Sequence, residues 1–121
     1  GGALMISLPA SVRVYLSTAP TDMRKSFDGL FTLVQQVFQC DPLEGHLFLF
    51  LNRRRDRLKI LWWDRDGLAL FCKRLESGTY QLPVVSEGAP GAEIDATQLA
   101  LLLNGVDLRS AKRRKRYSRV A

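Results

Sequence analysis

The spacing of apolar residues changes along this chain and marks out its elements. Over 12–16 apolar and polar residues alternate, which predicts a short strand. From Met23 to Phe38 apolar residues instead recur every three or four positions, so the spacing predicts an amphipathic helix over 22–39. Asp22 stands at the start of this helix, and we expect it to cap the helix N-terminus.

Three apolar runs of strand length come next. They are HLFLFLN (46–52), RLKILWW (57–63) and LALFCKRL (68–75). The Asp66-Gly67 step between the second and third runs is a strong hairpin signal, and residues 79–82 predict a fourth strand after another turn. Strands joined by such tight turns are predicted to form an antiparallel meander.

The last part of the body combines a loop with a second helix. Residues 83–94 are rich in Pro and Gly and are predicted to form a loop. Asp95 and Gln98 have the spacing of a capping box, which predicts a helix that ends near Gly105. The fold class is therefore predicted to be α+β: an antiparallel β-meander of about 4–5 strands with two helices packed on one face, followed by a basic C-terminal tail.

The length of 121 residues is that of one domain. We expect a single α+β domain over 5–108 and a basic, flexible tail over 109–121. Met5 is the expected natural start, with residues 1–4 left over from cloning. No run of about 18 apolar residues is present, and the first residues lack the basic and apolar regions of a signal peptide. We therefore expect a cytoplasmic protein without a membrane partner.

The net charge of +6 is unevenly distributed. Residues 1–107 carry eleven Lys and Arg against twelve Asp and Glu, whereas residues 108–121 carry seven Lys and Arg and no acid. Blocks of like charge commonly bind polyanions. We expect phosphate contacts, without base-sequence readout, from Arg109, Lys112, Arg113, Arg114, Lys115, Arg116 and Arg119. The alternatives are that the tail binds protein or only keeps the chain in solution.

A second group of cations gathers near the predicted hairpins. It comprises Arg53, Arg54, Arg55, Arg57, Lys59, Arg65, Lys73 and Arg74. We expect these residues to neutralise DNA phosphates, so that the affinity depends on salt; the alternative is that they protect an edge strand. For Trp62 and Trp63 we favour core packing, with one ring under the 22–39 helix and the other half-covered by arginine stems. The alternative is that the tryptophan that faces solvent stacks on an unpaired base.

The sequence offers few residues suited to catalysis or to metal binding. Cys40, Cys72 and the single histidine His46 do not make a disulfide framework or a four-ligand metal site, so we expect buried free thiols, no metal and no cofactor. Seven aspartates remain as candidate metal ligands: Asp22, Asp28, Asp41, Asp56, Asp64, Asp66 and Asp95. Most stand at predicted turns or caps, which explains them without catalysis. The sequence therefore favours a protein that is not an enzyme.

Three stretches of the chain resemble one protein family. They are DMRKSFDGL (22–30), GHLFLFLNRRRDRLKILWWDRDGLALFCKRLESG (45–78) and ATQLALLLNGVDLR (96–109). The family is the small accessory protein, often called TnpB, encoded by the second reading frame of bacterial insertion sequences of the IS66 type. The resemblance implies a protein that is required alongside a separate transposase and is not itself the catalyst. It carries no catalytic residue over to this chain.

These observations lead to three hypotheses. In the first, a non-enzymatic accessory protein binds DNA through its cationic hairpins and tail and assists the transposase. In the second, it docks on the transposase without touching DNA, through Arg24, Lys25 and Asp28 on an exposed helix face or through the sheet face with the spare tryptophan. In the third, it is a metal-dependent nuclease that needs Asp64 or Asp66. An exposed edge strand would also allow a homo-oligomer.

Overall fold

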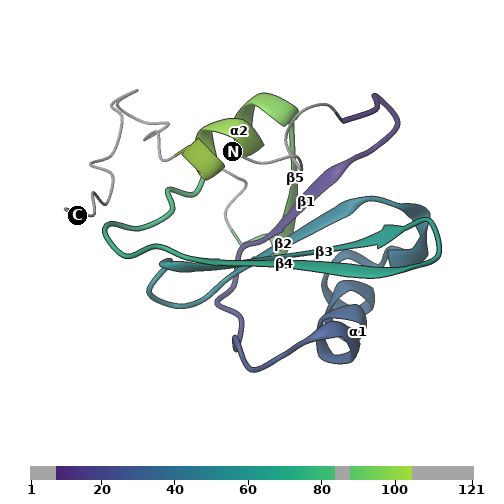
Figure 1. Cartoon of the computed structure of the whole chain (residues 1–121), viewed down its shortest axis with the longest axis horizontal. Helices are drawn as coiled ribbons and strands as arrows, with labels where there is room; N and C mark the ends of the chain where they lie inside the picture. Colours follow the sequence, from purple (N-terminus) through teal and green to yellow (C-terminus); the bar gives the residue numbers. More distant parts are fainter. Residues whose placement is uncertain (1–7, 84–87, 105–121) are drawn as a thin grey trace, which may run out of the picture.

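A five-stranded sheet with one helix on each face forms the protein, as shown by a computed structural model that describes residues 8–83 and 88–104 (Figure 1). The elements in chain order are β1 (Val14–Ser17), α1 (Phe27–Phe38), a short 3-10 helix η2 (Pro42–Glu44), β2 (Leu47–Leu51), β3 (Arg57–Asp64), β4 (Gly67–Arg74), β5 (Gly91–Ile94) and α2 (Ala96–Asn104). The α+β class predicted from the sequence is confirmed. None of these helices is long and apolar enough to cross a membrane.

The sheet has the order β4-β3-β2-β1-β5. Strands β2, β3 and β4 form the predicted antiparallel meander. Strand β1 departs from it, because Val14 pairs with Leu47 and the two strands run parallel. Helix α1 links β1 to β2, and a parallel neighbour needs a crossover of this kind rather than a tight turn. The sheet is therefore mostly antiparallel, with one parallel pair near its centre.

The fifth strand lies where a loop was predicted. Residues Gly91–Ile94 pair with β1, with Ile94 opposite Val14, although their sequence shows no alternation that would indicate a strand. The prediction of a strand over 79–82 is wrong. That segment is extended, but there Tyr80 donates its backbone N–H to the carbonyl of Arg55, at 2.7 Å, and buries its ring in the core.

Both faces of the sheet are covered because β2 is apolar at every position. Leu47, Leu49 and Leu51 point to one core, which α2 completes with Leu99 and Leu102. Phe48 and Phe50 point to the other core, which α1 completes with Leu30 and Val34. The prediction that both helices pack on one face is therefore wrong, and Figure 1 shows α1 and α2 on opposite sides of the sheet. A strand buried on both faces needs a layer on each.

Helix α1 begins five residues later than predicted, with Ser26 as its N-cap. Asp22 does not cap the helix, because its carboxylate accepts hydrogen bonds from the backbone N–H and the guanidinium of Arg24. Residues 22–26 form a turn, and Phe27 at the helix start is 43% exposed.

Helix α2 begins with the predicted capping box. The Gln98 N–H donates to the Asp95 carboxylate at 2.7 Å, and the Asp95 N–H donates to the Gln98 side chain at 2.9 Å. The predicted end of this helix at Gly105 lies outside the described residues.

Candidate nucleic-acid interface

The two hairpin turns of the meander lie at opposite ends of the sheet. Arg57 is paired with Arg74, whereas Asp64, seven positions further along β3, is paired with Gly67. At about 3.3 Å per residue, roughly 23 Å separates these ends. The β2–β3 turn therefore lies close to the end of β4, while Arg65 lies at the far end of the hairpin, apart from the other predicted contacts.

Most of the basic residues of the described body lie at the end of the sheet that holds the β2–β3 turn. This basic end contains Arg24, Lys25, Arg53, Arg54, Arg55, Arg57, Lys59, Lys73 and Arg74, with four acids: Asp22, Asp28, Asp56 and Glu76. The opposite, acidic end contains Asp41, Glu44, Asp64, Asp66, Glu93 and Asp95, with Arg13 and Arg65. A body that is nearly neutral as a whole is therefore strongly polarised along its strands.

The side chain of Asn52 holds the turn that carries the arginines at 53–55. Its carbonyl oxygen accepts hydrogen bonds from the N–H groups of Asp56, at 3.1 Å, and Arg57, at 3.0 Å. Its amide nitrogen donates to the Asp56 carboxylate at 2.6 Å, and this hydrogen bond lowers the pKa of Asp56 below its usual value. Arg55 adopts a left-handed conformation with φ of 59°, and all three arginine side chains are exposed. The sequence reasoning missed Asn52, whose signal was its place at the start of a turn.

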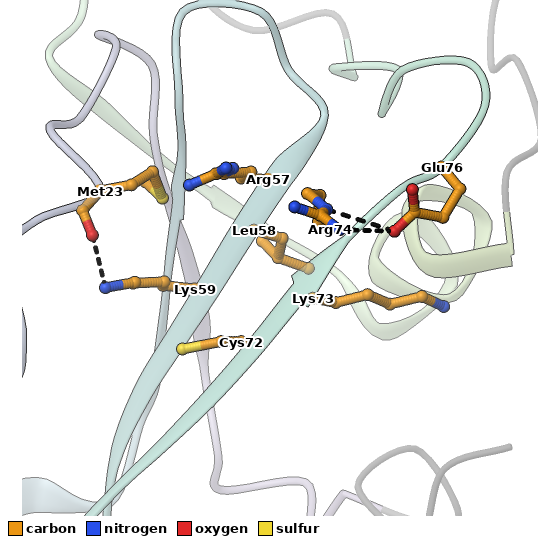
Figure 2. Close-up of a pocket in the computed structure, with 8 residues that line it drawn as sticks. All are labelled: Met23, Arg57, Leu58, Lys59, Cys72, Lys73, Arg74 and Glu76. Carbon is orange, nitrogen blue, oxygen red and sulfur yellow. Dashed lines mark hydrogen bonds and ion pairs between the residues drawn. The ribbon is translucent and has the colours of Figure 1, made fainter.

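A groove of about 590 Å³ runs beside this turn, between residues 22–26 and the paired ends of β3 and β4 (Figure 2). Arg57 and Arg74 stand directly opposite each other in its wall, and both are exposed. Glu76 binds Arg74 at 3.0 Å, which leaves two guanidinium groups for one carboxylate. Like charges on paired residues repel, so the groove favours an anion. Lys73 on β4 also lines this groove (Figure 2).

Lys59 lines the same groove but is already engaged. Its ammonium donates to the backbone carbonyls of Met23 and Lys25, at 2.7 and 2.6 Å. This contact ties the turn before α1 to the sheet. Since the ammonium is held by two carbonyls, the geometry indicates a structural role for Lys59 rather than the predicted phosphate contact.

Arg24 and Lys25 were predicted to lie on an exposed helix face, but they precede α1 and belong to the basic end. The guanidinium of Arg24 binds Asp22 at 2.7 Å. Hydrogen bonding from Arg24 lowers the pKa of Asp22 to about 2, so this exposed pair stays charged over a wide pH range. Asp28, the third residue of that set, is exposed in the first turn of α1.

The two tryptophans lie toward the acidic end of β3. Trp62 is paired with Ala69 and Trp63 with Leu68, so neither stands beside the arginine turn. Both are half-buried, and Trp62 packs against the core on the α2 side rather than under α1 as predicted. The alternation along β3 decides this, because Trp62 shares its face with Ile60.

The candidate metal ligands do not come together. Within residues 8–83 and 88–104 there is no group of three or more His, Cys, Asp or Glu residues placed to hold a metal ion. Asp64 and Asp66 flank Arg65 in the β3–β4 turn, where the Asp66 N–H donates to the Asp64 carbonyl at 2.6 Å. Both cysteines are free; Cys40 is half-buried, while Cys72 is exposed rather than buried as predicted.

Comparison with known proteins places the chain in a family. Residues 12–113 match the family model described as "IS66 Orf2 like protein". The chain belongs to this IS66 Orf2-like family. It is an accessory protein of IS66-type insertion sequences, as the resemblance implied, and its role lies in transposition. The tail residues beyond 104 lie outside the described structure, so their predicted phosphate contacts stay predictions.

Two relatives in Sinorhizobium fredii (strain NBRC 101917 / NGR234) match nearly the whole IS66 Orf2-like chain. "Uncharacterized protein y4hO" is 39% identical over 116 residues, which cover 96% of this chain and 99% of that protein. "Uncharacterized protein y4jC" is 36% identical over 119 residues, which cover 97% of this chain and 100% of that protein. No solved structure matches.

Proposed function

We propose that this IS66 Orf2-like protein is a non-catalytic DNA-binding accessory protein that assists a separate transposase. It binds the DNA backbone through the basic end of the sheet and through the basic residues at 109–119. The main support for this proposal is the separation of charge along the body, with nine basic and four acidic residues at one end of the sheet.

A polarised body of this kind orients itself in the field of a polyanion before contact. The basic end then approaches the phosphates, and the acidic end stays in solvent. Within the described residues no acid forms an ion pair with Arg53, Arg54 or Arg57. These guanidinium groups are therefore available to replace the counterions of DNA.

The proposal is tested by titrating duplex and single-stranded DNA at several salt concentrations with the full chain, with residues 1–108, and with a variant in which Arg53, Arg54, Arg55 and Arg57 are alanine. If all four arginines meet phosphates, the quadruple variant lowers the slope of log K against log salt by about 3 to 4. A slope that is unchanged by the four substitutions would refute the basic end as the interface. Loss of all binding in residues 1–108 would assign DNA contact to the tail alone.

Arg55 and Arg65 offer a matched pair for this experiment. Both adopt φ of 59°, so glycine relieves the same backbone strain at either position and removes one positive charge. Only Arg55 lies at the basic end. Arg55→Gly is expected to weaken DNA binding by about 3- to 10-fold, while Arg65→Gly binds like the natural chain. Equal losses in both variants would show that only the total charge matters.

A second candidate function, docking on the transposase, is favoured by one observation. Phe27, between Lys25 and Asp28 in the sequence, exposes 43% of its surface at the start of α1. An exposed aromatic residue with charged neighbours is a common anchor of a protein contact. Such a contact would capture the transposase from the same element at high salt, where phosphate contacts fade, and Phe27→Ala would abolish the capture.

A further inference from the structure

Strand β4 is an open edge of the sheet. Its eight residues all pair with β3, without a bulge, and in the described part of the chain no strand pairs with its other side. About half of its backbone N–H and C=O groups therefore point outward. Residues 67–72 contain no proline and no charged side chain, which are the usual means of protecting an edge. The pairing with the β3 side continues one position past β4, since Leu75 donates its N–H to the carbonyl of Asp56 at 2.7 Å.

The side chains of this edge are incompletely covered on both faces. Leu68 and Leu70 pack against the core under α1, and Phe71 packs against the core on the α2 side, but all three stay partly exposed. A further strand beside β4 would extend both apolar layers at once. The β5 edge offers less, because that strand has four residues.

The charge polarity of the body identifies the occupant of the edge. We propose that β4 pairs with β4 of a second copy of this chain, antiparallel, with Leu70 opposite Leu70. This register places Asp66 of the second copy beside Arg74, and the same contact is repeated across the two-fold axis. It also places the acidic end of each copy beside the basic end of the other. A parallel pairing would instead bring the Lys73 and Arg74 residues of both copies together.

The resulting dimer contains one continuous ten-stranded sheet. Residues paired across an antiparallel edge share a face, so both α1 helices lie on one side and both α2 helices on the other. The two basic ends then lie about one strand length apart, roughly 25 Å, at opposite ends of the β4–β4 interface. This inference does not rest on DNA binding, and it is tested without DNA.

A disulfide experiment tests the register directly. With Leu70 opposite Leu70, position 68 of one copy faces Cys72 of the other, and paired residues are about 5.5 Å apart at their Cα atoms, within disulfide range. In a Cys40→Ser background, Leu68→Cys is expected to form a covalent dimer on mild oxidation. Two Cys72 residues, or two cysteines at 68 with Cys72→Ser, lie about 13 Å apart and are not expected to cross-link. Absence of the dimer, or equal cross-linking in the single-cysteine controls, would overturn the register.

Swapping the charges of Asp66 and Arg74 tests the pairing without a cross-link. By analytical ultracentrifugation the natural chain is expected to form a weak dimer, since one strand from each copy makes a small interface. Asp66→Lys and Arg74→Glu each weaken dimerisation by about tenfold, because each places like charges side by side twice per dimer. The double variant restores it, and Arg13→Glu, a control at the acidic end, leaves it unchanged. A chain that stays monomeric near millimolar concentration, or a dimer indifferent to both single changes, would refute the proposal.

Discussion

Lys59→Met separates a structural lysine from a DNA-binding one. The substitution keeps the length of the apolar stem but removes the ammonium that donates to the carbonyls of Met23 and Lys25. The natural control is Lys73→Met on the neighbouring strand. Lys73 is exposed, and within the described residues its ammonium makes no hydrogen bond or ion pair.

The expected loss of stability follows from the two hydrogen bonds of the Lys59 ammonium, which lies 2.7 Å from the Met23 carbonyl oxygen and 2.6 Å from that of Lys25. A hydrogen bond to a charged group contributes about 1.5–3 kcal/mol. The groove is open, so water partly replaces the ammonium at the two carbonyls, and each contact contributes only about 1–1.5 kcal/mol. We expect Lys59→Met to lower the free energy of unfolding by about 2–3 kcal/mol, and Lys73→Met to change it by less than about 0.5 kcal/mol.

Urea unfolding followed by tryptophan fluorescence measures this difference. With a denaturant slope of about 2 kcal/mol per molar, the unfolding midpoint of Lys59→Met falls by about 1–1.5 M. DNA titrations of the same two variants give the opposite ranking, because Lys73→Met lowers the salt slope by about 1 and Lys59→Met leaves it unchanged. The reasoning is refuted if Lys59→Met is as stable as Lys73→Met and has the lower salt slope.

Two further predictions concern the acidic partner of Arg24 and the fifth strand. Hydrogen bonds from the side chain and the backbone of Arg24 lower the pKa of Asp22 to about 2. This pair therefore stabilises the fold above pH about 3.8, and its contribution is lost as the pH falls toward 2. Carbon-detected NMR should show that Arg24→Ala raises the pKa of Asp22 part of the way back toward 3.8, because the backbone N–H at position 24 remains. Gly91→Ala is expected to destabilise the fold by about 1–3 kcal/mol in urea unfolding, because a Cβ there would lie 2.3 Å from the Phe38 ring. Gly67→Ala is the control, because a Cβ at that position has no atom within 4 Å.

Much of the secondary structure was predictable because its signals are local. The three-to-four spacing up to Phe38 predicted α1, the alternation and the Asp66-Gly67 step predicted the β3–β4 hairpin, and the Asp95 and Gln98 pair predicted the start of α2. The error at the start of α1 has a different cause. Residues 22–26 have helical spacing, but Lys59 from a distant strand binds their carbonyls and holds them in a turn.

Strand β5 could not be found by the same reasoning. Gly91 lies against Phe38, more than fifty positions away in the chain, and the close approach explains a glycine where an alternating pattern would place a side chain. Its neighbour Pro90 also reads as a loop signal, yet its carbonyl accepts a hydrogen bond from the N–H of Thr18 at 3.1 Å. This segment is a strand because it pairs with β1, and the sequence of 91–94 alone does not show that β1 lies beside it.

The candidate interface also combines features that the sequence shows with features that only the tertiary structure decides. Clustered arginines at 53–57 and the basic residues at 109–119 are visible in the sequence, because charge and turn chemistry are properties of neighbouring residues. The tertiary structure alone decided that Arg24 and Lys25 join that cluster, that Arg65 leaves it, and that Lys59 is occupied by backbone carbonyls 34 and 36 positions away. It also decided that the helices lie on opposite faces and that the charges separate along the strands. These features depend on contacts between residues distant in the chain, which no local period or motif encodes.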